Sequence, residues 1–183
     1  MASAPTDDQP LDLGSLADGM PPGLSRERGA AMAQAARVCL TESQHPSPCS
    51  LTVDGGHAAN LPLAFEEAGD VELRSWNDRE EATQQGAYAV AILLMKRLDN
   101  LAVLERSRRG THFDWWLGPA GSDRLFQDKI CLEVSGIRDG SEAQIRERVS
   151  QKWERFGTAA SDGSNRRVVV VEYSRPLVRT RLS

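Results

Sequence analysis

A long helical pattern followed by three short apolar segments limits this chain to a mixed α/β fold. Residues 77–98 hold apolar side chains at helical spacing, namely Ala87, Val90, Ala91, Leu94 and Leu98. Asn77 or Asp78 can cap the first turn of this predicted helix. Gly86 lies in its middle, where glycine costs about 1 kcal/mol relative to alanine. We therefore expect the helix to pack closely on another backbone at Gly86.

The remaining elements of the second half follow a simple order. Three strand-like segments come first, at residues 101–107, 112–118 and 129–137. A second helix is predicted at residues 142–156. Residues 166–174 then contain four consecutive valines, which suits a strand buried on both faces. The order predicts an α/β layered domain that begins with antiparallel strands and ends with a crossover.

The N-terminal part of the chain shows weaker patterns. Residues 1–23 are rich in Pro, Gly and Asp without periodicity, so we expect them to be disordered or loosely packed. Three elements are predicted after them: a helix at 24–41 capped by Ser25, a strand at 50–53 and a strand at 71–76. We expect residues 24–76 to form an extension that packs on a core at 77–183. This extension can add a layer or a contact for a homodimer.

Size and composition predict one soluble domain in a reducing compartment. A chain of 183 residues, 40% of them hydrophobic, can bury one core. No apolar run is long enough to span a bilayer, and the N-terminus lacks a basic region followed by an apolar one. The three cysteines have neither disulfide-framework nor zinc-site spacing: Cys39, Cys49 and Cys131. We therefore expect a cytoplasmic location and no membrane partner.

The charge is distributed unevenly along the chain. Residues 1–100 contain 7 Lys and Arg against 15 Asp and Glu, whereas residues 101–183 contain 15 against 11. The net charges are therefore −8 and +4, and the total of −4 excludes a protein that coats nucleic acid with basic charge. The basic second half leaves room for a local phosphate-binding face or for an ordinary solvated surface.

Two carboxylates stand inside strand-like segments, where burying a charge is costly unless something compensates it. The first is Asp114, and strand alternation places Trp116 on its face and Phe113, Trp115 and Leu117 on the other. The second is Glu133, which shares a face with Cys131 and Ser135. If the two strands pair, the carboxylates converge, and close carboxylates share a proton or a cation. With no His or Cys in the pair, the cation favoured is Mg²⁺ or Mn²⁺.

Structural roles for the same residues stay open. Asp114 can accept hydrogen bonds from Thr111 or from backbone amides, and Glu133 can pair with Arg106 or Arg146. Three further residues need an interpretation. Glu80 can cap the predicted helix or lie in solvent. His112 can be a ligand, a base or an exposed side chain, and Trp115 can stack on a base or pack in the core.

The element order and the two carboxylates resemble the core of the restriction-endonuclease-like superfamily, the PD-(D/E)xK nucleases. The resemblance covers roughly residues 77–173, with Asp114 and Glu133 at the positions of the family's metal-binding acids. Ser135 stands where the family keeps its lysine, and no proline precedes Asp114. Some members have this lysine on the helix after the third strand, where this chain has Lys152. We expect Lys152 to take that role, with Lys129 as second choice; otherwise the fold is kept and cleavage is lost.

The resemblance implies a metal-dependent nuclease with Asp114, Glu133 and Lys152 as catalytic residues. It implies hydrolysis of phosphodiesters in DNA, in defence or repair, with Mg²⁺ or Mn²⁺ bound by the two acids. The expected nucleic-acid contacts are basic residues of the second half: Arg108, Arg109, Arg146 and Arg148. One alternative is an inactive module of this fold that binds nucleic acid or a protein subunit of a larger complex. Another is an assembly subunit that docks through its acidic N-terminal half.

Overall fold

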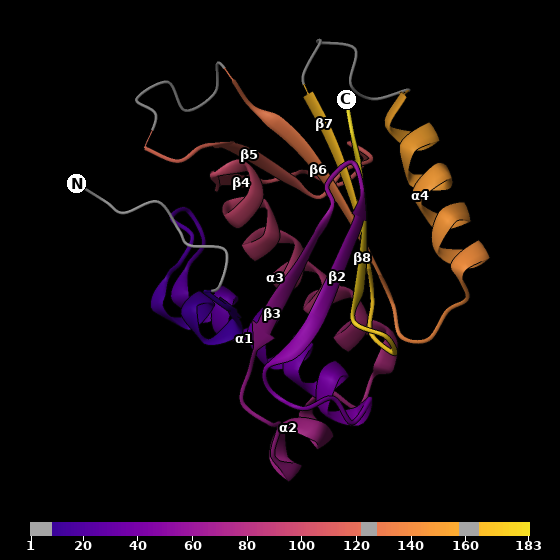
Figure 1. Cartoon of the computed structure of the whole chain (residues 1–183). Helices are drawn as coiled ribbons and strands as arrows, with labels where there is room; N and C mark the ends of the chain where they lie inside the picture. The colour runs from indigo at the N-terminus through magenta and orange to yellow at the C-terminus, as the bar shows by residue number, and fades with distance from the viewer. Residues whose placement is uncertain (1–8, 122–127, 158–164) are drawn as a thin grey trace.

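The computed structural model of the chain shows one curved sheet with helices on both faces (Figure 1). It describes residues 9–121, 128–157 and 165–183. Within them, eight strands lie in the order β1-β3-β2-β8-β7-β6-β5-β4. Their bounds are β1 Leu11–Asp12, β2 Cys49–Gly55, β3 Ala59–Ala64, β4 Leu101–Arg106, β5 Trp115–Pro119, β6 Ile130–Ile137, β7 Asn165–Glu172 and β8 Leu177–Leu182. The helices are η1 Leu13–Asp18, α1 Arg26–Glu42, α2 Asp70–Ser75, α3 Arg79–Asp99 and α4 Glu142–Gly157. The mixed α/β class is as expected.

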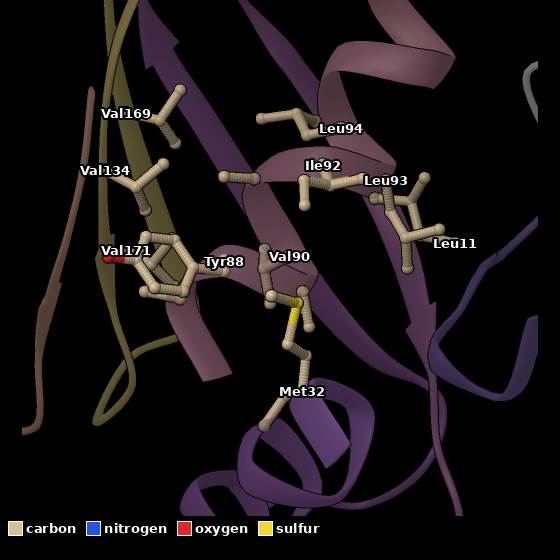
Figure 2. Packing of buried hydrophobic residues seen from close by; sticks show 14 of the residues in the cluster. Leu11, Met32, Tyr88, Val90, Ile92, Leu93, Leu94, Val134, Val169 and Val171 are labelled. Atoms are coloured by element: carbon tan, nitrogen blue, oxygen red, sulfur yellow. The ribbon is translucent and has the colours of Figure 1, made fainter. Parts of the chain in front are cut away.

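Helices α1 and α3 pack together on one face of the sheet. Each begins at a predicted cap: the Ser25 hydroxyl accepts from Arg28 N, and the Asp78 carboxylate accepts from Glu80 N. At Gly86 the two backbones approach so closely that a Cβ atom would lie 2.8 Å from the Cα of Ala36. The expected close packing at this glycine is therefore confirmed. This helix pair holds the largest hydrophobic core of the described residues (Figure 2).

Helix α4 covers the opposite face of the sheet over a smaller core. Ile145, Val149 and Phe156 of α4 pack there on Val168 and Val170 of β7. The neighbouring valines of β7 point to the other side, and Val169 and Val171 belong to the larger core. All four valines are buried, so β7 is covered on both faces, as the valine run predicts.

The predicted meander and crossover are both present. β4 pairs with β5 and β5 with β6 in antiparallel fashion, and β6 pairs with β7 in parallel after the chain has passed through α4. The start of β5 differs from expectation, because the strand begins only at Trp115. Phe113 precedes this start and packs edge-on against Trp116 under α4, not on the face of Trp115.

The N-terminal half is more closely integrated than an extension packed on a core. β2 pairs with β3 and, in parallel, with β8, so residues 24–76 build part of the same sheet. The strand predicted at 71–76 is wrong, because Asp70–Ser75 forms the short helix α2. Glu72 accepts from the Gly69 N–H across its first turn, and this local cap favours a helix over the weak alternation.

Residues 9–23 also differ from the expected loose N-terminus. Leu11, Leu13 and Leu16 are buried in the larger core. Pro22 O accepts a hydrogen bond from Val103 N, which covers part of the outer edge of β4. Residues 1–8 lie outside the described part of the chain, so the expectation for them is not addressed. Among described residues, no helix is long and apolar enough to cross a membrane.

Candidate carboxylate site

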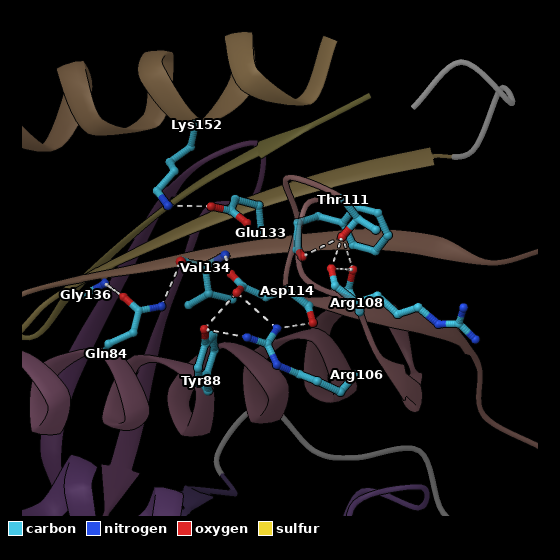
Figure 3. Close-up of polar contacts among 12 residues, drawn as sticks. Gln84, Tyr88, Arg106, Arg108, Thr111, Asp114, Glu133, Val134, Gly136 and Lys152 are labelled. Atoms are coloured by element: carbon cyan, nitrogen blue, oxygen red, sulfur yellow. Dashed lines mark hydrogen bonds and ion pairs between the residues drawn. The ribbon is translucent and has the colours of Figure 1, made fainter. Parts of the chain in front are cut away.

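Asp114, directly before β5, lies near Glu133 in the middle of β6. Trp115 pairs with Leu132, but Asp114 N also donates to Leu132 O at 2.8 Å, so the regular β5–β6 ladder ends before Asp114. The Asp114 carboxylate lies between Glu133 and the hydroxyl of Tyr88 on α3 (Figure 3). The pairing of the two predicted strands therefore brings the two acids together.

Three donors fix the Asp114 carboxylate. Oδ1 accepts from the Tyr88 hydroxyl at 2.7 Å and from Arg106 at 3.1 Å, and Oδ2 accepts from Val134 N at 2.8 Å. Burial and the adjacent Asp114 charge raise the pKa of Tyr88 to about 12, so its hydroxyl keeps the proton that it donates. Asp114 thus accepts from a backbone amide, as one structural interpretation anticipates, but the amide belongs to β6.

Lys152 of α4 pairs with Glu133. Its Nζ lies 2.5 Å from Glu133 Oε1, and the two side chains are 21% and 9% exposed. Burial, and next the charge of Asp114, raise the pKa of Glu133 to about 7, while Lys152 acts in the opposite direction. The Glu133 carboxylate is therefore close to its protonation midpoint at neutral pH. Its cation partner is Lys152 and not Arg106 or Arg146.

Ser135, which stands where the resemblance leads us to expect a lysine, makes a different contact. The Ser135 hydroxyl accepts from Arg148 of α4 at 2.8 Å. Because Arg148 is engaged there, it does not line the space beside Asp114 and Glu133. On the other face, Gln84 of α3 donates to Val134 O at 3.1 Å and accepts from Gly136 N at 3.4 Å. Helices on both faces of the sheet thus fix the backbone and side chains of β6.

A basic pocket of about 380 Å³ opens beside the two carboxylates. Its wall is the β4–β5 connection, where Gly110 and His112 have positive φ angles of 94° and 62°. Besides the two acids, the pocket is lined by His112 and by four arginines: Arg106, Arg108, Arg109 and Arg155. This excess of cations around a carboxylate pair suits the binding of an anion such as a phosphate.

The structure separates the four arginines predicted to contact nucleic acid. Arg108 and Arg109 line the pocket, and the Arg108 side chain extends away from the carboxylates (Figure 3). Arg146 lies outside the pocket on the exposed side of α4, 3.6 Å from Glu142. Together with Arg148, it therefore belongs to a different surface. Arg155, which the sequence patterns did not single out, lines the pocket instead.

The remaining sequence candidates have structural positions. Trp115 is 2% exposed and packs edge-on against Tyr88, which confirms its core role. Lys129 Nζ lies 4.2 Å from the centre of the Trp116 ring. Glu80 lies in the exposed first turn of α3, where its N–H is capped by Asp78. His112 is exposed at the pocket wall, next to but not bonded in the carboxylate network of the described residues.

The two carboxylates fit a hard divalent cation whose other ligands come from water and a substrate. In the described residues no group of three or more His, Cys, Asp or Glu side chains gathers, so within this part of the chain the site offers a pair of carboxylates. Mg²⁺ is commonly bound by one or two carboxylates, with waters and substrate phosphates as its other ligands. Asp114 Oδ1 is shared with Arg106, however, so a cation there must displace or share this contact.

No protein-family model, curated protein or solved structure matches this chain at a significant level.

Proposed function

We propose that this protein is a divergent member of the restriction-endonuclease-like fold that hydrolyses phosphodiester bonds in DNA with Mg²⁺ or Mn²⁺. The observation that supports this most is the contact of Lys152 with Glu133 at 2.5 Å, beside Asp114. It puts two acids and a lysine together although Ser135 interrupts the family motif in the sequence. The order α3, β4, β5, β6, α4 and β7 agrees with this proposal.

The roles follow from the chemistry of the side chains. Asp114 and Glu133 would hold the metal ion, which supplies an activated water and neutralises phosphate charge. Lys152 is a cation positioned on the α4 side of the pair, where it can orient the attacking water and stabilise the developing negative charge. Tyr88 and the Val134 N–H keep the Asp114 carboxylate in one orientation. The arginines of the pocket would bind the phosphates that flank the reacting bond.

A specific observation favours a second function, an inactive module of the same fold that binds DNA or a protein subunit. Both carboxylates already have a cation partner, Arg106 for Asp114 and Lys152 for Glu133. Such pairs also occur in purely structural networks. For either function we propose a role in defence or repair. We place it in the cytoplasm, because Cys39, Cys49 and Cys131 are buried and form no disulfide.

Cleavage of labelled DNA with Mn²⁺ separates these functions. We expect the wild-type protein to cut, Asp114→Asn to be inactive, and Lys152→Ala to lose at least about a hundredfold in rate, in the range of one removed charged stabiliser. Lys152→Ala should stay folded, because its side chain lies at the border of the core. Gln151→Ala, one residue away on the exposed side of α4, is the matched control. DNA left uncut by the wild type, while it still binds, would support the inactive module.

A further inference from the structure

Arg106 is bound to Asp114, one of the two carboxylates that the proposed metal ion requires. It donates to Asp114 Oδ1 at 3.1 Å and also to the Asp114 backbone oxygen. A second nitrogen of the same guanidinium lies 3.1 Å from the Tyr88 hydroxyl. The side chain is 39% exposed and lines the basic pocket, so it can also reach a ligand there.

A β-bulge places Arg106 at this position. The β4–β5 register shifts between Val103 and Glu105, so that Arg106 pairs with Trp115. Without the extra residue, Glu105 would stand opposite Trp115 and take the position that Arg106 has in the ladder. In the bulged register the Arg106 guanidinium lies over the rings of Tyr88 and Trp115, 5.0 Å from each centre. These aromatic faces hold the cation by contacts that do not depend on Asp114.

We infer that Arg106 is a positioning residue that exchanges the Asp114 carboxylate for a phosphate of the substrate and thereby couples metal binding to DNA binding. The inference rests on the proposed function. A guanidinium binds carboxylate and phosphate oxygens with the same forked geometry, so the exchange replaces one charge-assisted pair by another. A divalent cation on Asp114 repels Arg106, and a phosphate in the pocket attracts it. Tyr88 and Val134 N retain Asp114 during the exchange.

The consequence is a reciprocal linkage. Without DNA, Arg106 competes with the metal ion, so metal affinity is low. With DNA, Arg106 is drawn to phosphate, and metal affinity rises by the factor by which the metal raises DNA affinity. The site would therefore bind little metal until DNA occupies the pocket.

Titration calorimetry with Mn²⁺, with and without a short phosphorothioate DNA duplex, tests this coupling. We expect Arg106→Gln to bind Mn²⁺ roughly tenfold more tightly than wild type when DNA is absent, in the usual range of site-to-site coupling. DNA should tighten Mn²⁺ binding to wild type, and the increase should be about tenfold smaller in Arg106→Gln. Arg28→Gln is the matched control, because Arg28 also lies over Trp115, at 5.2 Å, without contacting Asp114. It should follow wild type.

The outcomes separate this inference from the proposed function. Mn²⁺ binding that requires Asp114 but is equal in wild type and Arg106→Gln overturns the exchange and leaves the nuclease proposal standing. No Mn²⁺ binding in any arm overturns both. If Arg106→Gln does not fold, Arg106→Lys, which keeps the charge but not the fork, should show weaker coupling than wild type. Coupling in Arg106→Lys equal to that of wild type contradicts the inference.

Discussion

At the scale of single residues, the site consists of two acids whose charges are compensated by cations from neighbouring elements. Asp114 and Glu133 are close, and each is paired with a cation from another element. Asp114 pairs with Arg106 of β4, and Glu133 pairs with Lys152 of α4.

The sequence singled out Asp114, Glu133 and Lys152, and the structure brings these side chains near one another. Strand alternation placed Asp114 on the face of Trp116, but its carboxylate contacts Tyr88 of α3, which also packs on Trp115. The sequence did not predict the contacts of Tyr88 and Arg106 with Asp114. Those depend on the bulge in β4 and on the crossing of α3 under β5.

The raised pKa of Glu133 predicts a pH-dependent stability. In the folded state the pKa of Glu133 is about 7, whereas in the unfolded chain its carboxyl has the ordinary pKa of 4.5. Between these values the folded state binds more protons, so Glu133 makes the free energy of unfolding fall as pH rises through this window. The free energy of unfolding of Glu133→Gln should therefore rise relative to that of wild type by about 1–3 kcal/mol as the pH increases from 4.5 to 7.

Urea denaturation at a series of pH values measures this difference. Glu154→Gln, an exposed change on the same helix as Lys152, serves as the control and should show the wild-type slope. A stability difference between Glu133→Gln and wild type that does not change with pH would show that Glu133 is ionised throughout.

At the scale of elements, long periodic patterns were predicted well and short ones were not. The helices α1, α3 and α4, the meander and β7 lie where periodicity and caps placed them. Residues 71–76 alternate over too short a span to outweigh an acidic first turn, and the result is the helix α2. β3 and β8 were not predicted. β3 contains Pro62, which weakens its strand pattern. β8 has three consecutive polar side chains, Arg179, Thr180 and Arg181, which hide the apolar alternation of a strand.

The contact between α1 and α3 predicts the effect of a methyl group at Gly86. In an ordinary helix interior, Gly→Ala stabilises by about 1 kcal/mol. Here the new Cβ would stand 2.6 Å from the Tyr173 hydroxyl and 2.8 Å from Ala36 Cα, so Gly86→Ala should instead destabilise by about 1–3 kcal/mol. Thermal unfolding measures this. Gly69→Ala, where a Cβ meets nothing within 4 Å, should change little. A stabilised Gly86→Ala protein would mean that the two helices can separate at no cost.

At the scale of the whole molecule, part of the positive charge of the second half of the chain is concentrated at one pocket. The acidic N-terminal half builds β1, β2, β3 and the helices α1 and α3, whereas four arginines of the second half line the pocket beside Asp114 and Glu133. The sequence indicated a basic half but could not select its members. Arg108 and Arg109 line the pocket, while Arg146 and Arg148 lie elsewhere.

This division predicts how DNA binding depends on salt. Arg109→Gln should weaken binding and lower the slope of log affinity against log salt by about one, because one phosphate contact is lost. Arg146→Gln removes the same charge outside the pocket and should leave that slope near the wild-type value. Fluorescence anisotropy at several salt concentrations compares the two. Equal effects would indicate a diffuse charge attraction in place of a pocket.

The central claim is that Asp114 and Glu133 together hold a catalytic metal ion. Crystals grown with Mn²⁺ and a phosphorothioate DNA duplex, measured at the manganese absorption edge, test it directly. We expect an anomalous peak about 2.1 Å from an oxygen of each carboxylate, a spacing typical of such hard cations, with Arg106 turned to a phosphate. DNA seated in the pocket with no anomalous peak between the two carboxylates, and Arg106 still on Asp114, would contradict it.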